Sequence, residues 1–263
     1  MINLSIEVLD QAGNKLAECS NTDEVYLVYQ DTYKEGDKIV FKSSEKNQYF
    51  IAQIDDALGE AFVYFTENEV VYNVPSGEKR TNFSPKVFSG NIHLLHLRLA
   101  TKEEIAGYKN LAKNVIDQNG IEGLYPHAKA NVETRGEAVF AARNAIDGVC
   151  ENRSHGPWPY QSWGINMQDD AEMKLDFGRL VAVDKIVLYT RSDFPHDNWW
   201  EQVKIVFSDD SELVWDLEKS YKPHIINIEQ KKIKWLVLKD LKKADDPSPF
   251  PALTQIEVYG VEA

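Results

Sequence analysis

The sequence predicts an all-β protein, an N-terminal β-sandwich or partial barrel followed by a second β-sandwich. Short runs of β-branched and aromatic residues recur along the whole chain, and turn-forming residues separate them. Between the runs of the second half, no segment of useful length shows the 3.6-residue apolar period of a helix. Strands connected by such short turns are expected to pair antiparallel and to pack as sheets.

The first half opens with a clear strand pattern. Apolar residues at positions 2, 4, 6 and 8 alternate with polar neighbours, and turn residues follow at 10–14. Further strands are expected at residues 25–29, 38–42, 48–54, 61–65, 69–74 and 92–99. His93 and His96 lack metal-ligand spacing to a nearby cysteine or histidine, so they are interpreted as ordinary strand residues. The pattern assigns no role to residues 1–100.

A capping box marks the expected domain boundary. Thr101 and Glu104 have the spacing with which a threonine caps a helix and a glutamate reaches back, and Gly107 limits that helix. We therefore expect a first domain at 1–100, a helical linker at 101–107 and a second domain at 108–263. All six tryptophans lie beyond residue 150, which marks the second half as different.

The second half shows the same strand signals. Apolar residues at 171, 173, 175 and 177 alternate with charged ones, and Asp209 and Asp210 are typical of a hairpin turn. Further strands are expected at residues 185–190, 203–208, 213–217, 225–228, 233–239 and 253–259. Trp163, one of Trp199 and Trp200, Trp215 and Trp235 are expected in the core.

Charge and composition exclude several partners. The net charge is −13, whereas nucleic acids and anionic membranes are bound through clustered lysine and arginine. No run approaches the ~20 apolar residues of a membrane helix, so membrane insertion is not expected. Two cysteines and the lack of a secretory signal indicate the cytoplasm, although a secreted protein without its leader would look the same. The sequence sets no oligomeric state.

An ordered series of short motifs resembles the discoidin or coagulation-factor C-type domain, the galactose-binding-like group that includes carbohydrate-binding module family 32. The series begins at Asn110, continues with residues 144–148, 162–164 and 175–178, and closes at 256–260. It covers about residues 108–260. The resemblance implies a jelly-roll sandwich that binds ligands, commonly sugars, with loops at one end. Phospholipid or protein is the ligand in some relatives.

The resemblance also implies a structural calcium ion. In sugar-binding relatives, the segment that matches residues 144–148 wraps calcium with carbonyl oxygens, an aspartate and a glutamate from the last strand. The matching residues are Asn144, Asp147 and Glu257, and hard oxygen ligands suit calcium. In the alternative interpretation, Asp147 caps a turn and Glu257 is an exposed strand residue.

Two loops are rich in side chains that hold sugars, which need an aromatic ring for stacking and polar groups for the hydroxyls. The first spans residues 155–163, the second spans 191–200, and a third stretch at 125–135 adds another wall. The predicted ligand-binding residues are His127, Arg135, His155, Trp158, Tyr160, Arg191, Asp193, His196, Asp197, Asn198 and Trp199.

Three functions remain open at this point. The favoured one is non-catalytic carbohydrate binding at these loops. A glycan-active enzyme could use Asp193, Asp197 and Glu133 with the three histidines at 127, 155 and 196, because glycoside cleavage needs two carboxyl groups. A protein-interaction module could instead bind another polypeptide at the aromatic end of the sandwich.

Overall fold

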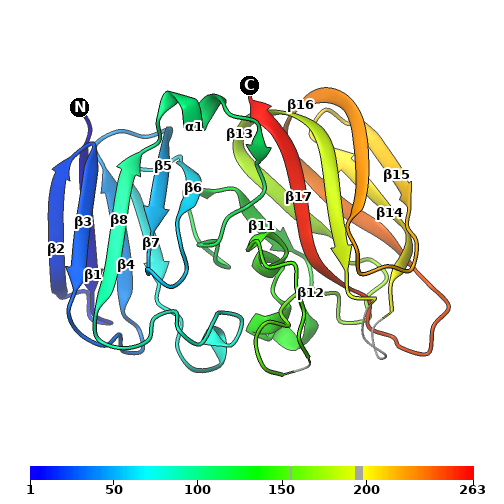
Figure 1. The fold of residues 1–263 in the computed structure, drawn as a ribbon, viewed down its shortest axis with the longest axis horizontal. Coiled ribbons are helices and arrows are strands. Elements are labelled where there is room, and N and C mark those ends of the chain that lie inside the picture. Colours follow the sequence, from blue (N-terminus) through cyan, green and yellow to red (C-terminus); the bar gives the residue numbers. More distant parts are fainter. Residues whose placement is uncertain (155, 193–197) are drawn as a thin grey trace.

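The structure is a computed structural model that describes residues 1–154, 156–192 and 198–263. These residues form two β lobes that lie side by side along the long axis of the molecule (Figure 1). Each lobe has its own core of buried apolar side chains. The all-β prediction is confirmed.

The first lobe is a sandwich of two antiparallel sheets. One sheet has the order β2 (Lys15–Thr22), β1 (Asn3–Leu9), β4 (Lys38–Ser43) and β7 (Glu69–Asn73). The other has the order β10 (Leu124–Tyr125), β6 (Ala61–Phe65), β5 (Gln48–Gln53), β8 (His93–Leu99) and β3 (Glu24–Tyr29). Residues at alternate positions of these strands, such as Ile6 and Val63, are fully buried between the sheets.

The connector α1 (Lys102–Ala106) has the predicted capping box. The Thr101 hydroxyl accepts a hydrogen bond from the Glu104 amide at 3.2 Å, and the Glu104 carboxylate accepts one from the Thr101 amide at 2.8 Å. Arg98 also donates two hydrogen bonds to Glu104, at 2.7 and 2.8 Å. The helix is therefore fixed to the end of β8.

The predicted boundary at 107/108 needs correction, because the chain returns to the first lobe after α1. The strand β9 (Lys109–Asn110) pairs with β17 (Ala252–Glu262) of the second lobe. Val115, Ile116 and Ile121 are then buried in the first core, and β10 adds a strand to the first lobe. We therefore assign residues 1–99 and 115–125 to the first lobe.

The second lobe is one antiparallel sheet that folds around the second core as a jelly-roll sandwich. Its order is β12 (Trp163–Gly164), β17 (Ala252–Glu262), β13 (Met173–Thr190), β16 (His224–Lys243), β14 (Trp200–Phe207) and β15 (Glu212–Asp216). In addition, β11 (His127–Ala130) pairs with β13. The strand β13 changes register between Asp176 and Val181, and Gly178 has a left-handed φ of 66° there.

The tryptophans of this lobe mostly follow the prediction. Trp163 and Trp200 are fully buried with ring centroids 6.3 Å apart, and Trp215 is also buried. Trp235 is only half-buried, with the Lys174 ammonium 5.3 Å from its ring. The expectation that Trp235 lies in the core is wrong, because its neighbour Leu236 takes the inward face of β16.

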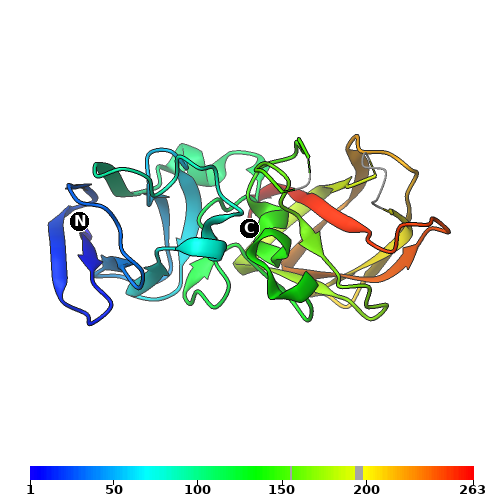
Figure 2. The ribbon, with the colours of Figure 1, turned by 90° about the horizontal axis from the view of Figure 1, so that it is seen from below.

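Short 3-10 helices carry much of the polar chemistry near the lobe junction. They are η1 (Gly77–Arg80), η2 (Thr134–Gly136), η3 (Ala138–Phe140) and η4 (Ala142–Ile146). Seen from below, the green segment that carries η2 to η4 lies at the middle of the molecule, next to the first lobe (Figure 2). Within the described ranges, no helix is long and apolar enough to span a bilayer.

A buried ion pair of the second lobe is in contact with a tyrosine of the first lobe. Arg179 of β13 donates hydrogen bonds to both carboxylate oxygens of Glu262, at 2.7 and 2.8 Å. Tyr49 of β5 donates a third to the same carboxylate at 3.0 Å, and its ring lies 5.4 Å from the guanidinium. Both charged side chains are nearly inaccessible, and the two contacts of Tyr49 link β5 to β13 and β17.

Candidate functional site

A pocket of about 350 Å³ lies in the second lobe between three loops. We call it the loop pocket, and residues of 134–140, 162–167 and 250–252 line it together with Arg191. The lining side chains that bear on its chemistry are Thr134, Arg135, Phe140, Ser162, Asn166, Met167, Arg191 and Phe250. Its volume is at the lower end of the range for small-ligand sites.

Three residues of this pocket have left-handed backbone conformations that side chains rarely adopt. The φ angles are 53° at Arg135, 51° at Asn166 and 58° at Met167. The Thr134 hydroxyl accepts a hydrogen bond from the Asn166 amide at 2.9 Å, which fixes the two turns against each other. At Gly164 a Cβ would come within 2.5 Å of that hydroxyl, so only glycine fits. Such local strain is common at functional sites.

The loop pocket exposes apolar side chains that the core does not use. Met167 is 56% exposed and Phe250 is 43% exposed, and the half-buried ring of Phe140 lines the same pocket. Apolar surface of this kind is available for the flat, apolar face of a ligand.

Polar groups lie deeper in the same pocket. Ser162 is fully buried, and its hydroxyl has no hydrogen-bond partner among the described residues. The Arg191 guanidinium is 1% exposed and donates a hydrogen bond to the Tyr160 carbonyl oxygen. The pocket thus combines an apolar rim with hydrogen-bonding groups below it.

An ion pair fixes the Arg135 side chain at the rim. Its guanidinium donates two hydrogen bonds to the Glu137 carboxylate, at 2.5 and 2.9 Å, and lies 5.5 Å from the ring of Phe140. This pairing with Arg135 lowers the pKa of Glu137. Although the pair is solvent-exposed, the bidentate geometry limits the rotation of Arg135.

Of the predicted ligand-binding residues, the structure brings Arg135 and Arg191 together at the loop pocket. Tyr160 contributes its carbonyl oxygen to Arg191, and Trp158 is half-buried in the adjoining loop. His155, Asp193, His196 and Asp197 lie outside the described residues. The pocket residues Phe140, Met167 and Phe250 carry no motif, and no sequence signal singled them out.

Three predicted ligand-binding residues have structural contacts instead. Asn198 is fully buried, and its amide donates to the carbonyl oxygens of Ala244 and Ser248 at 2.9 and 3.0 Å. Trp199 packs under the Lys219 ammonium, 4.7 Å from its ring. His127 bonds Asp117 at 2.7 Å; burial lowers the pKa of His127, but this hydrogen bond and the carboxylate charge outweigh burial and raise it.

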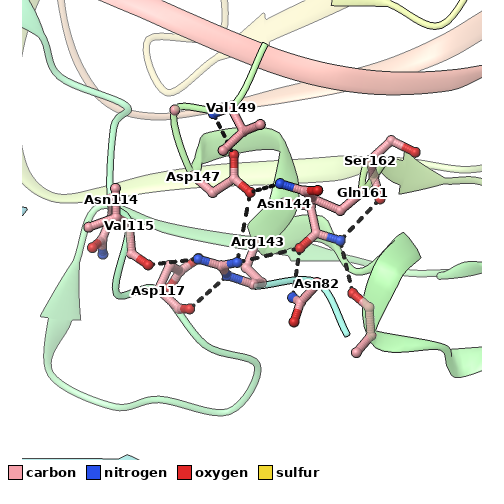
Figure 3. Close-up of polar contacts among 12 residues, drawn as sticks. Asn82, Asn114, Val115, Asp117, Arg143, Asn144, Asp147, Val149, Gln161 and Ser162 are labelled. Carbon is pink, nitrogen blue, oxygen red and sulfur yellow. Dashed lines mark hydrogen bonds and ion pairs between the residues drawn. The ribbon is translucent and has the colours of Figure 1, made fainter. Parts of the chain in front are cut away.

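The segment proposed for calcium contains a different arrangement. The Asp147 carboxylate accepts hydrogen bonds from the Val149 amide at 2.8 Å and from the Gln161 side chain at 2.9 Å (Figure 3). This geometry matches the alternative in which Asp147 caps a turn. Burial raises the pKa of Asp147 to about 6, against the lowering effect of nearby Arg143.

The positive charge in this segment is the guanidinium of Arg143. Arg143 is 4% exposed and lies 3.9 Å from the Asp147 carboxylate. It donates to the backbone oxygens of Asp117 and Val115 at 2.9 and 2.8 Å, and its third contact is the side-chain oxygen of Asn144 at 3.5 Å (Figure 3). Four oxygen atoms therefore already surround a positive charge.

The three predicted calcium ligands have other partners in the structure. Asn144 and Asp147 are committed to Arg143 and to amide donors, and the Glu257 carboxylate accepts a hydrogen bond from Tyr259 at 3.2 Å. Within residues 1–154, 156–192 and 198–263, no group of three His, Cys, Asp or Glu side chains could hold a metal. A calcium ion beside Asp147 would also have to overcome repulsion from Arg143.

We expect calcium to leave the thermal stability of the protein unchanged. An ion that binds only the folded state would raise the melting temperature as its concentration rises. The measurement is a thermal melt of fully chelated protein with and without millimolar calcium. A calcium-dependent increase in melting temperature would show that the Asp147 segment rearranges around the ion.

No protein-family model and no curated protein sequence matches the chain. Among solved structures, it resembles chitosan-binding module 1 of a chitosanase/glucanase from Paenibacillus sp. IK-5, with 18% identity and a TM-score of 0.41. That match covers 58% of this chain and 99% of the module.

Two further similar structures come from other bacteria. The fucose-binding module SpX-3 of Streptococcus pneumoniae has 17% identity and a TM-score of 0.40. That match covers 59% of this chain and 99% of the module. The family 32 carbohydrate-binding module of C. perfringens NanJ, solved with galactose, has 16% identity and a TM-score of 0.39 and covers 50% of this chain and 91% of the module. All three are carbohydrate-binding modules.

Proposed function

We propose that this protein binds a carbohydrate in the loop pocket without cleaving it. The observation that carries the proposal is the chemistry of the pocket, where exposed Phe250 and Met167 lie above the hydroxyl of Ser162 and the guanidinium of Arg191. A sugar ring has apolar C–H faces and hydroxyls at its edge, so it matches an apolar rim with polar groups below.

The proposed geometry assigns a role to each part of the pocket. The Phe250 ring stacks on a sugar face, and Met167 packs beside it, since a thioether adapts to irregular apolar surfaces. The strained turns at Arg135 and Asn166 hold polar side chains at the rim, where they donate to hydroxyls. Among the described lining residues, these groups provide stacking and hydrogen bonds rather than the pair of carboxyl groups that glycoside cleavage requires.

Substituting Phe250 with alanine is expected to weaken sugar binding by roughly tenfold to a hundredfold. Loss of a stacking ring costs ~1 to 3 kcal/mol at other stacking platforms, which corresponds to that change in affinity. The measurement is a glycan-array screen followed by titration calorimetry with the best sugar. Because the Phe250 side chain is 43% exposed, the melting temperature of the Phe250→Ala variant should stay close to that of the wild type.

Tyr26→Ala is the matched control, since Tyr26 is a 51% exposed aromatic residue of the first lobe. It should leave sugar affinity unchanged. Equal affinity of Phe250→Ala and wild type would place the sugar site outside the loop pocket. Release of reducing sugar by the wild type during the same titration would instead favour the glycan-active enzyme.

A further inference from the structure

A second and larger cavity lies between the two lobes. This inter-lobe cleft has a volume of about 780 Å³. Residues 73–83 of the first lobe form one wall, and residues 133–143 of the second lobe form the other. Ligand sites occur preferentially at such junctions between domains.

The inter-lobe cleft and the loop pocket share one wall. In the segment 133–141, Glu133, Gly136 and Ala138 face the cleft, whereas Arg135 and Phe140 face the pocket. A single backbone segment therefore separates the two cavities. A chain-like ligand that occupies the pocket can pass over this wall into the cleft.

A buried polar network connects the floors of the two cavities. Asn82 and Arg143 line the cleft, and the Asn82 amide donates to the Asn144 side-chain oxygen at 2.8 Å (Figure 3). The Asn144 amide donates in turn to the carbonyl oxygen of Ser162, at 3.2 Å, and Ser162 lines the loop pocket. The network fixes both floors relative to each other.

The cleft offers hydrogen-bond acceptors. Asn82 is 4% exposed, and its side-chain oxygen has no donor among the described residues. The charged residues of the lining are mainly acidic, with Glu35, Asp37, Glu78, Asp117 and Glu133 against Lys79 and Arg143. A ligand that suits this surface donates hydrogen bonds and carries no negative charge, because like charges repel in a partly enclosed cleft.

We propose that the inter-lobe cleft is a second subsite for the same glycan, so that the protein binds an extended, hydroxyl-rich and neutral or amine-bearing chain. This inference rests on the proposed sugar binding at the loop pocket. One sugar occupies the pocket, the chain crosses the 133–141 wall, and later sugars donate hydrogen bonds to Asn82 and to the exposed carboxylates of Glu35 and Glu78. Chains of acidic sugars are excluded by the charge of the cleft.

Chain length and charge test the proposal directly. The probes are glucosamine and its tetramer, the N-acetylglucosamine tetramer and the galacturonic acid tetramer, each titrated by calorimetry at low salt. We expect the glucosamine tetramer to bind at least about tenfold more tightly than the monomer. The neutral tetramer should bind more weakly than the cationic one, and the acidic tetramer should not bind.

A cleft-filling variant locates the effect. Ser76→Trp places a bulky ring on the first-lobe wall and should reduce the affinity of the glucosamine tetramer to that of the monomer. Ser20→Trp, on the exposed edge strand β2, is the matched control and should bind like the wild type. Glu35→Gln should weaken the cationic tetramer and leave the neutral one unchanged.

The outcomes separate this inference from the proposed function. Tetramer binding that survives Ser76→Trp, or equal binding of the acidic tetramer, overturns the cleft subsite while the loop pocket stands. If none of these probes binds, the cleft subsite is also overturned. Sugar binding at the pocket is then decided by the array screen and Phe250→Ala alone.

Discussion

Replacing Arg143 with methionine should lower the free energy of unfolding by about 3 to 5 kcal/mol, the cost of removing one partner of a buried ion pair. Methionine keeps much of the volume but leaves the Asp147 carboxylate buried without its cation. The backbone oxygens of Val115 and Asp117 also lose their donor. Chemical denaturation measures the change, and a constant denaturant slope shows that the folded state is otherwise intact.

The pH dependence distinguishes a lost ion pair from a simple packing defect. Burial already raises the pKa of Asp147 to about 6, and removal of Arg143 should raise the pKa further. Because a protonated Asp147 needs no cation, Arg143→Met should be less destabilised at pH 5 than at pH 8.

The double variant with Asp147→Asn provides the control for this interpretation. With Asp147→Asn present, the destabilisation caused by Arg143→Met should no longer depend on pH. A double-mutant cycle isolates this coupling between the two residues. A loss for Arg143→Met that is the same at both pH values, or below about 1 kcal/mol, would contradict the assigned role of the guanidinium.

Substituting Trp200 with alanine should destabilise the protein by about 3 to 5 kcal/mol, since its side chain is fully buried and a large cavity would remain. Its ring packs against Trp163, at 6.3 Å between centroids, so the strands β12 and β14 both lose contacts. The measurement is the free energy of unfolding by denaturant titration.

Trp199 is the internal control, because it is the adjacent residue on the opposite face of the chain. It is half-buried, and its main described contact is the Lys219 ammonium over its ring. Trp199→Ala should therefore cost about 1 kcal/mol or less. A reversed order of the two losses would mean that Trp199, not Trp200, supports the core.

The regular strands were predictable because a buried face leaves a period of two in the sequence. The strand β6 lies at the predicted residues 61–65, and β1, β4, β5 and β7 agree to within a residue or two. The strand β2 was missed, because as an edge strand it buries little and shows no apolar alternation. Residues 185–190 were predicted as a separate strand but belong to the long β13. The register shifts within β13 do not end its pairing with β16.

The loop pocket was only partly predictable. Arg135 and Arg191 were expected from the mixture of residue types in their loops, and the structure brings both to the pocket. Phe250 and Met167 come from loops far apart in the sequence, and only the folded sheet places them together. Arg143 was overlooked because a single arginine in an apolar segment has no local pattern that identifies its partners.

The return of residues 115–125 to the first lobe has a consequence for how the chain folds during synthesis. The first lobe lacks part of its core and the strand β10 until residue 125 has left the ribosome. The second lobe waits longer, because its strand β9 pairs with β17, which ends at Glu262. The nascent chain therefore carries open strand edges of the first lobe until β10 has emerged, and of the second lobe until β17 has emerged.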